Sequence, residues 1–223
     1  MTDPVPAPIS PRRPLHIGDT APAFEARTTM GHVGLGDYRG RWLLLFSHPA
    51  DFTPVCTTEF VALSKAADRF ATLDCALLAI SVDSLYSHLA WVRAIRDSFG
   101  VTVSFPIVED PSMVIGRAYG MIAEGAGDAG TMRSTFIIDP GGIIRAITCY
   151  PATVGRSVDE ILRMVAALQR VDAEDVVTPE GWQPGDAVLM PAEVHQNAML
   201  ASAGGDTWFH RVAPESAAAP VAK

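Results

Sequence analysis

The residues HPADFTPVCTTE at positions 48–59 decide the fold, because they join a strand pattern to a helix pattern. The wholly apolar run WLLLF at positions 42–46 precedes them and predicts a buried strand. Thr53 is a favoured helix N-cap residue, and Pro54 suits the first helical position after it. Cys56 then lies in the first turn, where unpaired backbone N–H groups and the positive end of the helix dipole favour a thiolate. The alternative interpretation of Cys56 is a buried, inert cysteine.

A second apolar run at positions 75–82 follows the helix, which we expect to end near Phe70. Two such runs joined by a helix form a strand–helix–strand unit. Their lack of polar alternation predicts a parallel sheet that is covered on both faces. Another helix is expected from Asp83 or Ser84 to Gly100. Its apolar side chains at helical spacing are Leu85, Leu89, Val92 and Phe99, with Trp91 and Ile95 beside them.

The second half of the main domain predicts a hairpin and a last helix. Strand patterns at positions 133–138 and 143–150 flank the turn sequence DPGG at 139–142. Ser157 and Glu160 form a capping-box pattern ahead of an amphipathic segment. The order strand–helix–strand, middle segment, strand–strand–helix indicates an α/β protein with a thioredoxin-like fold. That fold would carry N-terminal and central insertions and a small C-terminal domain.

Composition divides the chain into four segments. The proline-rich residues 1–14 and the alanine-rich residues 214–223 are expected to be disordered. Residues 15–171 would form the thioredoxin-like domain, and residues 172–213 would form a C-terminal dimerisation domain. We expect a homodimer or a higher ring oligomer, because the aromatic side chains of the C-terminal domain need cover that a second subunit would supply. These aromatic residues are Trp182, Trp208 and Phe209.

Charge and cysteine content exclude several classes of function. The 223-residue chain has a net charge of −8 and no cluster of basic residues, so a nucleic-acid partner is not expected. No run approaches the ~20 apolar residues of a membrane span, and no secretory signal pattern is visible. The three cysteines lie far apart and form no CxxC motif. These features predict a cytoplasmic protein whose thiols stay reduced.

Neither a metal nor a cofactor is expected from the sequence. The six histidines show no spacing typical of metal ligands. Residues 125–130 spell GxGxxG, but a dinucleotide site needs a strand before this motif and a helix after it, and here the predicted order is reversed.

The surroundings of Cys56 favour one kind of chemistry. The positions three residues before and after it are Thr53 and Glu59, so the second cysteine of a disulfide oxidoreductase is missing. A lone thiolate is suited to attack the electron-poor oxygen of a peroxide, which gives a sulfenic acid. The hydroxyl of Thr53 would donate to the thiolate if it points at the sulfur. The charge that moves onto the peroxide oxygens needs fixed donors such as helix N–H groups and an arginine.

The pattern PxxxTxxC at positions 49–56 resembles the peroxiredoxin signature. The longer segment 48–59 is similar to the one-cysteine subfamily with a C-terminal extension, which is peroxiredoxin-6-like. The resemblance covers about residues 15–212 and implies a thiol-specific peroxidase for hydrogen peroxide and alkyl hydroperoxides. Further segments that look similar to this subfamily are SVD at 81–83, HLAW at 88–91, FPI at 105–107 and YPATVGR at 150–156.

The resemblance implies roles for individual residues. Cys56 would be the peroxidatic nucleophile, with Thr53 and Pro49 shaping and shielding its pocket. Arg133 would favour the thiolate and bind the peroxide, although a surface arginine is the alternative.

Three further residues would support the site by resemblance. Glu59 and Arg156 match positions that form an ion pair around the arginine, and a plain surface pair is the alternative. His48 matches a histidine near the pocket, and a packed structural histidine is the alternative.

The other cysteines decide how the sulfenic acid is reduced. Cys75 begins a predicted buried strand, and Cys149 lies near the end of the hairpin, so both are interpreted as structural. No cysteine follows about residue 190, where relatives with a resolving cysteine in a C-terminal arm carry one. We therefore expect reduction by an external thiol of the small-thiol, thioredoxin or glutaredoxin type. A redox sensor or holdase chaperone on the same scaffold is the alternative function.

Overall fold

The computed structural model describes residues 13–122, 130–201 and 208–213. Within these residues the main sheet has seven strands in the order β2-β1-β5-β4-β3-β6-β7. Its strands are β1 (Glu25–Thr28), β2 (Gly31–Gly34), β3 (Trp42–Ser47), β4 (Cys75–Ser81), β5 (Ile107–Glu109), β6 (Arg133–Ile138) and β7 (Ile144–Tyr150). The helices of this body are η1 (Leu35–Tyr38), α1 (Pro54–Lys65), α2 (Ala67–Thr72), α3 (Leu85–Phe99), α4 (Val114–Ala118) and α5 (Val158–Ala173).

Strand β3 organises the sheet. It pairs in parallel with β4 and antiparallel with β6, so that Leu44 lies opposite Leu77 on one side and Ile137 on the other. Strands β6 and β7 form an antiparallel hairpin. The predicted strand–helix–strand unit, hairpin and thioredoxin-like plan are therefore confirmed. Because β3 and β6 run in opposite directions, the end of β3 and the start of β6 meet at one edge of the sheet.

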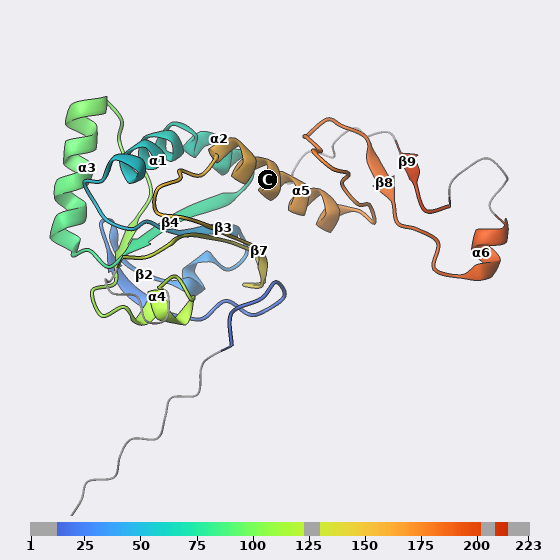
Figure 1. Cartoon of the computed structure of the whole chain (residues 1–223), viewed down its shortest axis with the longest axis horizontal. Helices are drawn as coiled ribbons and strands as arrows, with labels where there is room; N and C mark the ends of the chain where they lie inside the picture. Colours follow the sequence, from blue (N-terminus) through green and yellow to red (C-terminus); the bar gives the residue numbers. More distant parts are fainter. Residues whose placement is uncertain (1–12, 123–129, 202–207, 214–223) are drawn as a thin grey trace, which may run out of the picture.

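Both faces of the sheet are covered, as the apolar strand runs predict. Alternate residues of β3, such as Leu44 and Phe46, pack with side chains of α1, α2, α3 and α5. The residues between them, Leu43 and Leu45, pack on the other face with η1 and α4. Figure 1 shows α1, α2, α3 and α5 on one side of the sheet and α4 on the other.

Two helices differ from the sequence expectation. The helix predicted to reach Phe70 is interrupted at Ala66, which separates α1 from α2. Helix α3 buries His88, Trp91 and Ile95, whereas Leu89 is 45 % exposed and Phe99 is 56 % exposed. Apolar residues occur on two sides of this helix, and the side that carries Trp91 faces the core.

The capping box before α5 is only half formed. The Ser157 hydroxyl accepts the backbone N–H of Glu160 at 3.3 Å. The Glu160 carboxylate pairs with Arg163 instead of returning to the N-cap.

The C-terminal segment forms a small unit beyond α5, made of β8 (Val188–Met190), α6 (Gln196–Ala201) and β9 (Arg211–Ala213). Figure 1 shows that it extends away from the sheet. Trp182 is only 3 % exposed, because it packs with Val176 and Val188, and its Nε1 donates to the Asp186 carbonyl. The expectation of an exposed Trp182 is therefore wrong. Trp208 and Phe209 remain exposed, at 38 % and 62 %.

Some expectations fall outside the described residues. These are most of the N-terminal segment 1–14, the glycine-rich motif 125–130 except its last residue, and the tail 214–223. Among the described helices, none combines the length and apolar character that crossing a membrane requires.

Candidate active site

The junction between β3 and α1 positions Cys56. Thr53 is the N-cap residue with an extended backbone, Pro54 is the first helical residue, and Cys56 is the third, as predicted. Its side chain is fully buried. The end of β3 is tied to the start of β6 through Ser47, whose hydroxyl donates to the Met132 carbonyl at 2.6 Å. This link brings the first residue of β6 beside the helix terminus.

That first residue is Arg133. Its Nη1 lies 3.3 Å from the Cys56 sulfur, although 77 positions separate the two residues in the sequence. The guanidinium is only 2 % exposed. Its Nε and Nη2 donate to the Ala152 carbonyl at 3.0 and 2.6 Å, which fixes the plane of the group. A fixed positive charge at this distance stabilises a thiolate.

Glu59, one turn after Cys56, links two buried arginines. Its Oε2 accepts Arg133 Nη1 at 2.9 Å and Arg156 Nη2 at 2.8 Å. Its Oε1 accepts the Nε and the backbone N–H of Arg156 at 2.9 and 2.8 Å. Burial raises the pKa of Glu59, but Arg156 and then Arg133 outweigh this effect and keep the pKa below its usual range. The structure therefore brings together the three charged residues that the sequence placed at the site.

The buried cluster beside Cys56 is not balanced in charge. Two guanidinium groups and one carboxylate leave one uncompensated positive charge in a buried site. Buried charges are costly unless they are paired. A Cys56 thiolate supplies the missing negative charge, whereas a neutral thiol does not.

The structure decides where the Thr53 hydroxyl points, which the sequence left open. Its hydroxyl donates to the Ala50 carbonyl at 2.9 Å instead of donating to the sulfur. A hydroxyl has one proton, so the remaining lone pairs of this oxygen can only accept. Pro49 is half-buried in the same loop.

His48 belongs to a buried network that the sequence did not predict. Its Nε2 lies 2.9 Å from Asp51 Oδ1, and His88 Nδ1 lies 2.9 Å from Asp51 Oδ2. The three side chains could present ligand atoms within 4.8 Å of one another, although the histidines show no metal-ligand spacing in the sequence. The HLAW segment resembles the subfamily, and it was the one signal that could have directed attention to His88.

Cys149 is exposed, which differs from the structural role expected of it. It lies on β7 between Thr148 and Tyr150, and both of these neighbours line a hollow on the helix side of the sheet. Successive side chains of a strand point to opposite faces, so Cys149 faces away from α1 and Cys56. Its sulfur lies 3.6 Å from Met132 Sδ.

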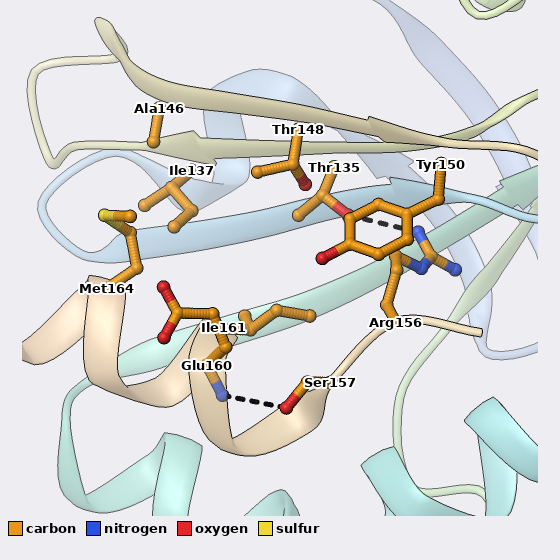
Figure 2. A pocket seen from close by; sticks show the side chains of 10 residues that line it. All are labelled: Thr135, Ile137, Ala146, Thr148, Tyr150, Arg156, Ser157, Glu160, Ile161 and Met164. Carbon is orange, nitrogen blue, oxygen red and sulfur yellow. Dashed lines mark hydrogen bonds between the residues drawn. The ribbon is translucent and has the colours of Figure 1, made fainter. Parts of the chain in front are cut away.

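Figure 2 shows the side chains that line a hollow between β6, β7 and α5. Its volume is about 30 Å³. Arg156 lies at its wall, where its Nη1 donates to Thr135 Oγ1 at 3.1 Å. Cys56 is not among its lining residues. The hollow therefore borders the arginine cluster without opening onto the sulfur.

We expect Glu59→Gln to lower the free energy of unfolding by about 3–5 kcal/mol, because two buried arginines would lose their shared counter-charge. Urea denaturation followed by circular dichroism measures this change. The matched control is Glu160→Gln, whose carboxylate is 47 % exposed and pairs with Arg163. This control should cost less than about 1 kcal/mol. Equal losses in the two variants would show that the buried cluster contributes no more to the free energy of unfolding than an exposed ion pair does.

Known proteins with similar sequences point to the same chemistry. Residues 17–147 match the AhpC/TSA family, and residues 167–201 match the C-terminal domain of 1-Cys peroxiredoxin. The chain is 44 % identical over 198 residues to Peroxiredoxin 2 of Picrophilus torridus, covering 88 % of this chain and 98 % of that protein. It is 49 % identical over 169 residues to the peroxiredoxin of Aquifex aeolicus, covering 75 % and 76 %.

Solved structures agree with this result. A yeast mitochondrial 1-Cys peroxiredoxin superposes with a TM-score of 0.80 at 39 % identity, covering 90 % of this chain and all of that one. A cysteine-to-serine mutant of peroxiredoxin 6 from Arenicola marina superposes with a TM-score of 0.76 at 34 % identity, covering 82 % and 86 %. The family match spans more than half of the chain, and the buried cysteine lies beside an arginine at the expected junction. This chain thus belongs to the AhpC/TSA family and is a peroxiredoxin of the one-cysteine type with a C-terminal extension, a thiol-dependent peroxidase.

Proposed function

We propose that Cys56 is the peroxidatic nucleophile and that Arg133 and Thr53 bind the peroxide. The observation that carries this assignment is the 3.3 Å separation between Arg133 Nη1 and the buried Cys56 sulfur. The thiolate attacks the nearer peroxide oxygen, so an S–O bond forms while the O–O bond breaks. The leaving oxygen takes a proton and departs as water or an alcohol, and Cys56 becomes a sulfenic acid.

The surrounding residues divide the remaining tasks. Arg133 stabilises the charge that develops on the peroxide oxygens, as a fixed donor does in an oxyanion hole. The Thr53 hydroxyl oxygen accepts a hydrogen bond from the O–H of the peroxide, since its own proton is donated to the Ala50 carbonyl. Glu59 and Arg156 keep the Arg133 guanidinium in place.

Two neighbouring residues assist from the loop before α1. Pro49 shields the sulfur from bulk water, and His48 supports the loop from the end of β3. Hydrogen peroxide and alkyl hydroperoxides are the proposed substrates.

The sulfenic acid is reduced by a thiol from outside this chain. Burial raises the pKa of the Cys75 thiol to about 12, which makes it a poor nucleophile at neutral pH. Cys149 faces the opposite side of the sheet from Cys56. The yeast relative is described as resolved through glutathione and thioredoxin systems, and we propose a reductant of the small-thiol, thioredoxin or glutaredoxin type for this chain.

One experiment tests this cycle. Reduced protein is treated with one equivalent of hydrogen peroxide, and its cysteines are mapped by mass spectrometry with and without dimedone. We expect a dimedone adduct on Cys56 and continued peroxide consumption when dithiothreitol is present. A Cys56–Cys149 disulfide would contradict the external-thiol cycle. Consumption of one equivalent followed by no further turnover would favour the redox-sensor alternative.

We also propose that the chain is a cytoplasmic homodimer, or a higher ring of such dimers. Support comes from apolar side chains left exposed in the C-terminal unit, including Val194 at 84 %, Phe209 at 62 % and Val212 at 61 %. Residues 172–213 would act as the dimerisation domain beside a peroxidase domain of residues 15–171. Sedimentation that finds only a 23.8 kDa species would contradict this assembly.

A further inference from the structure

The buried network around Asp51 has a definite arrangement of protons. His88 Nδ1 lies 2.9 and 3.1 Å from the two Asp51 oxygens, and His48 Nε2 lies 2.9 Å from one of them. Relative exposure is 0 % for both histidines and 7 % for Asp51. These separations are those of N–H···O bonds, so protons link the three groups.

The hydrogen-bond partners indicate which histidine is charged. His88 Nε2 lies 3.3 Å from the Val108 carbonyl, so both of its ring nitrogens face oxygens that can only accept. A histidine that donates from both nitrogens is an imidazolium. His48 donates from Nε2, whereas its buried Nδ1 has no hydrogen-bond partner among the described residues, which fits a neutral ring.

The pKa shifts of the other two groups in the network fit a neutral His48 and an ionised Asp51. Burial lowers the pKa of His48 more than the bond to Asp51 raises it. Burial raises the pKa of Asp51, but its bonds from His48 and His88 outweigh this effect and keep the pKa below its usual range. The other carboxylates nearby are Asp83, which accepts the Asp51 backbone N–H, and Glu109, which accepts the Leu85 N–H at the start of α3 and pairs with Arg27.

The loop that Asp51 anchors is strained. Phe52, between Asp51 and Thr53, has a φ of 56°, which a residue with a side chain adopts at a cost. Its side chain is 59 % exposed, so packing gives little compensation. Such a conformation persists only when its neighbours fix it. Asp51 fixes it through two histidines by its side chain and through Asp83 by its backbone.

We propose that His88 is an imidazolium counter-ion to Asp51 and a positioning residue for the peroxidase, because it stabilises the strained loop that presents Thr53. This assignment rests on the proposed role of Thr53 in binding the peroxide. His88 touches neither the peroxide nor the sulfur. It acts from α3, through Asp51, on the geometry of the loop before α1.

The charge state is tested on the wild-type protein. Histidine labelled with ¹⁵N is observed at pH 7 by long-range ¹H–¹⁵N correlation, and signals are assigned with His88→Gln and His48→Gln. We expect two protonated nitrogens on His88 and a single protonated Nε2 on His48. A bare nitrogen on His88 would overturn the proposal, and so would loss of both histidine N–H signals on adding one equivalent of Zn²⁺. This measurement is independent of Thr53 and of activity.

The positioning role is tested by a double-mutant cycle. The second-order rate constant with hydrogen peroxide should fall about 10- to 100-fold in His88→Gln, as expected when a binding group is displaced by a fraction of an ångström to an ångström. Adding Asp51→Asn should restore most of this rate, because the carboxylate that needs a counter-ion is then absent. The exposed His32→Gln variant is the control and should leave the rate unchanged.

Two results would contradict the positioning role. One is an unchanged rate constant in His88→Gln. The other is a rate loss in the double variant that equals or exceeds the loss in His88→Gln, which would indicate that His88 acts through packing and not through its charge. If Thr53→Val has a normal rate while the ¹⁵N result holds, the proposed role of Thr53 fails and the ion pair stands.

Discussion

Cys56→Ser should abolish peroxide turnover, with a loss on the order of 10⁶-fold, as when a catalytic nucleophile is removed. A serine hydroxyl at the same place is not ionised at neutral pH and cannot displace the peroxide oxygen as a thiolate does. Steady-state consumption of hydrogen peroxide with dithiothreitol measures the loss. Folding should be retained, because the substitution exchanges one small buried side chain for another of similar shape.

The matched control is Cys149→Ser, which removes the exposed thiol on the far face of the sheet. We expect its turnover to stay within about twofold of the wild type, since surface substitutions away from a site have small effects. Turnover that survives in Cys56→Ser would refute the assignment of the nucleophile. Turnover lost in Cys149→Ser would instead show that Cys149 takes part in the cycle.

Local signals explain why the junction could be predicted from sequence. The apolar run of β3, the N-cap Thr53 and the first-turn Pro54 each act within a few residues of Cys56, and all three agree. The same holds for the hairpin, where a turn sequence separates two strand patterns. Such features depend on the backbone preferences of neighbouring residues and need no knowledge of the rest of the chain.

The side-chain partners of distant elements could not be predicted in this way. The Asp51–His88 bond spans 37 positions and exists because β4 and α3 return the chain to the end of β3. Helix α3 has apolar residues on two sides, so its sequence alone did not select the side that carries His88. The sequence left open whether the Thr53 hydroxyl donates to the sulfur, and a nearby carbonyl accepts its single proton instead. In each case the outcome depends on which groups the fold brings together.

Arg133→Gln should lower the second-order rate constant with hydrogen peroxide by about 10²- to 10³-fold, the usual effect of removing one fixed donor from developing charge. The variant also removes the positive charge that the thiolate balances, so the fraction of ionised Cys56 should fall. Stopped-flow fluorescence gives the rate, and thiolate absorbance near 240 nm gives the ionised fraction. Arg145→Gln is the control, because Arg145 pairs with Asp172 on the surface of α5, away from the sulfur.

The same variant separates a site residue from a structural one. Glu59 keeps its three hydrogen bonds from Arg156 when Arg133 is replaced, so the free energy of unfolding should fall by only about 1–3 kcal/mol. Glu59→Gln should lower the free energy of unfolding by more than Arg133→Gln does, since it leaves both arginines without their counter-charge. A rate loss in Arg133→Gln that merely follows its loss of stability would contradict a direct role at the sulfur. A large rate loss in a protein that still unfolds cooperatively is the expected result, because Arg133 alone of the two arginines donates to Cys56 within the described residues.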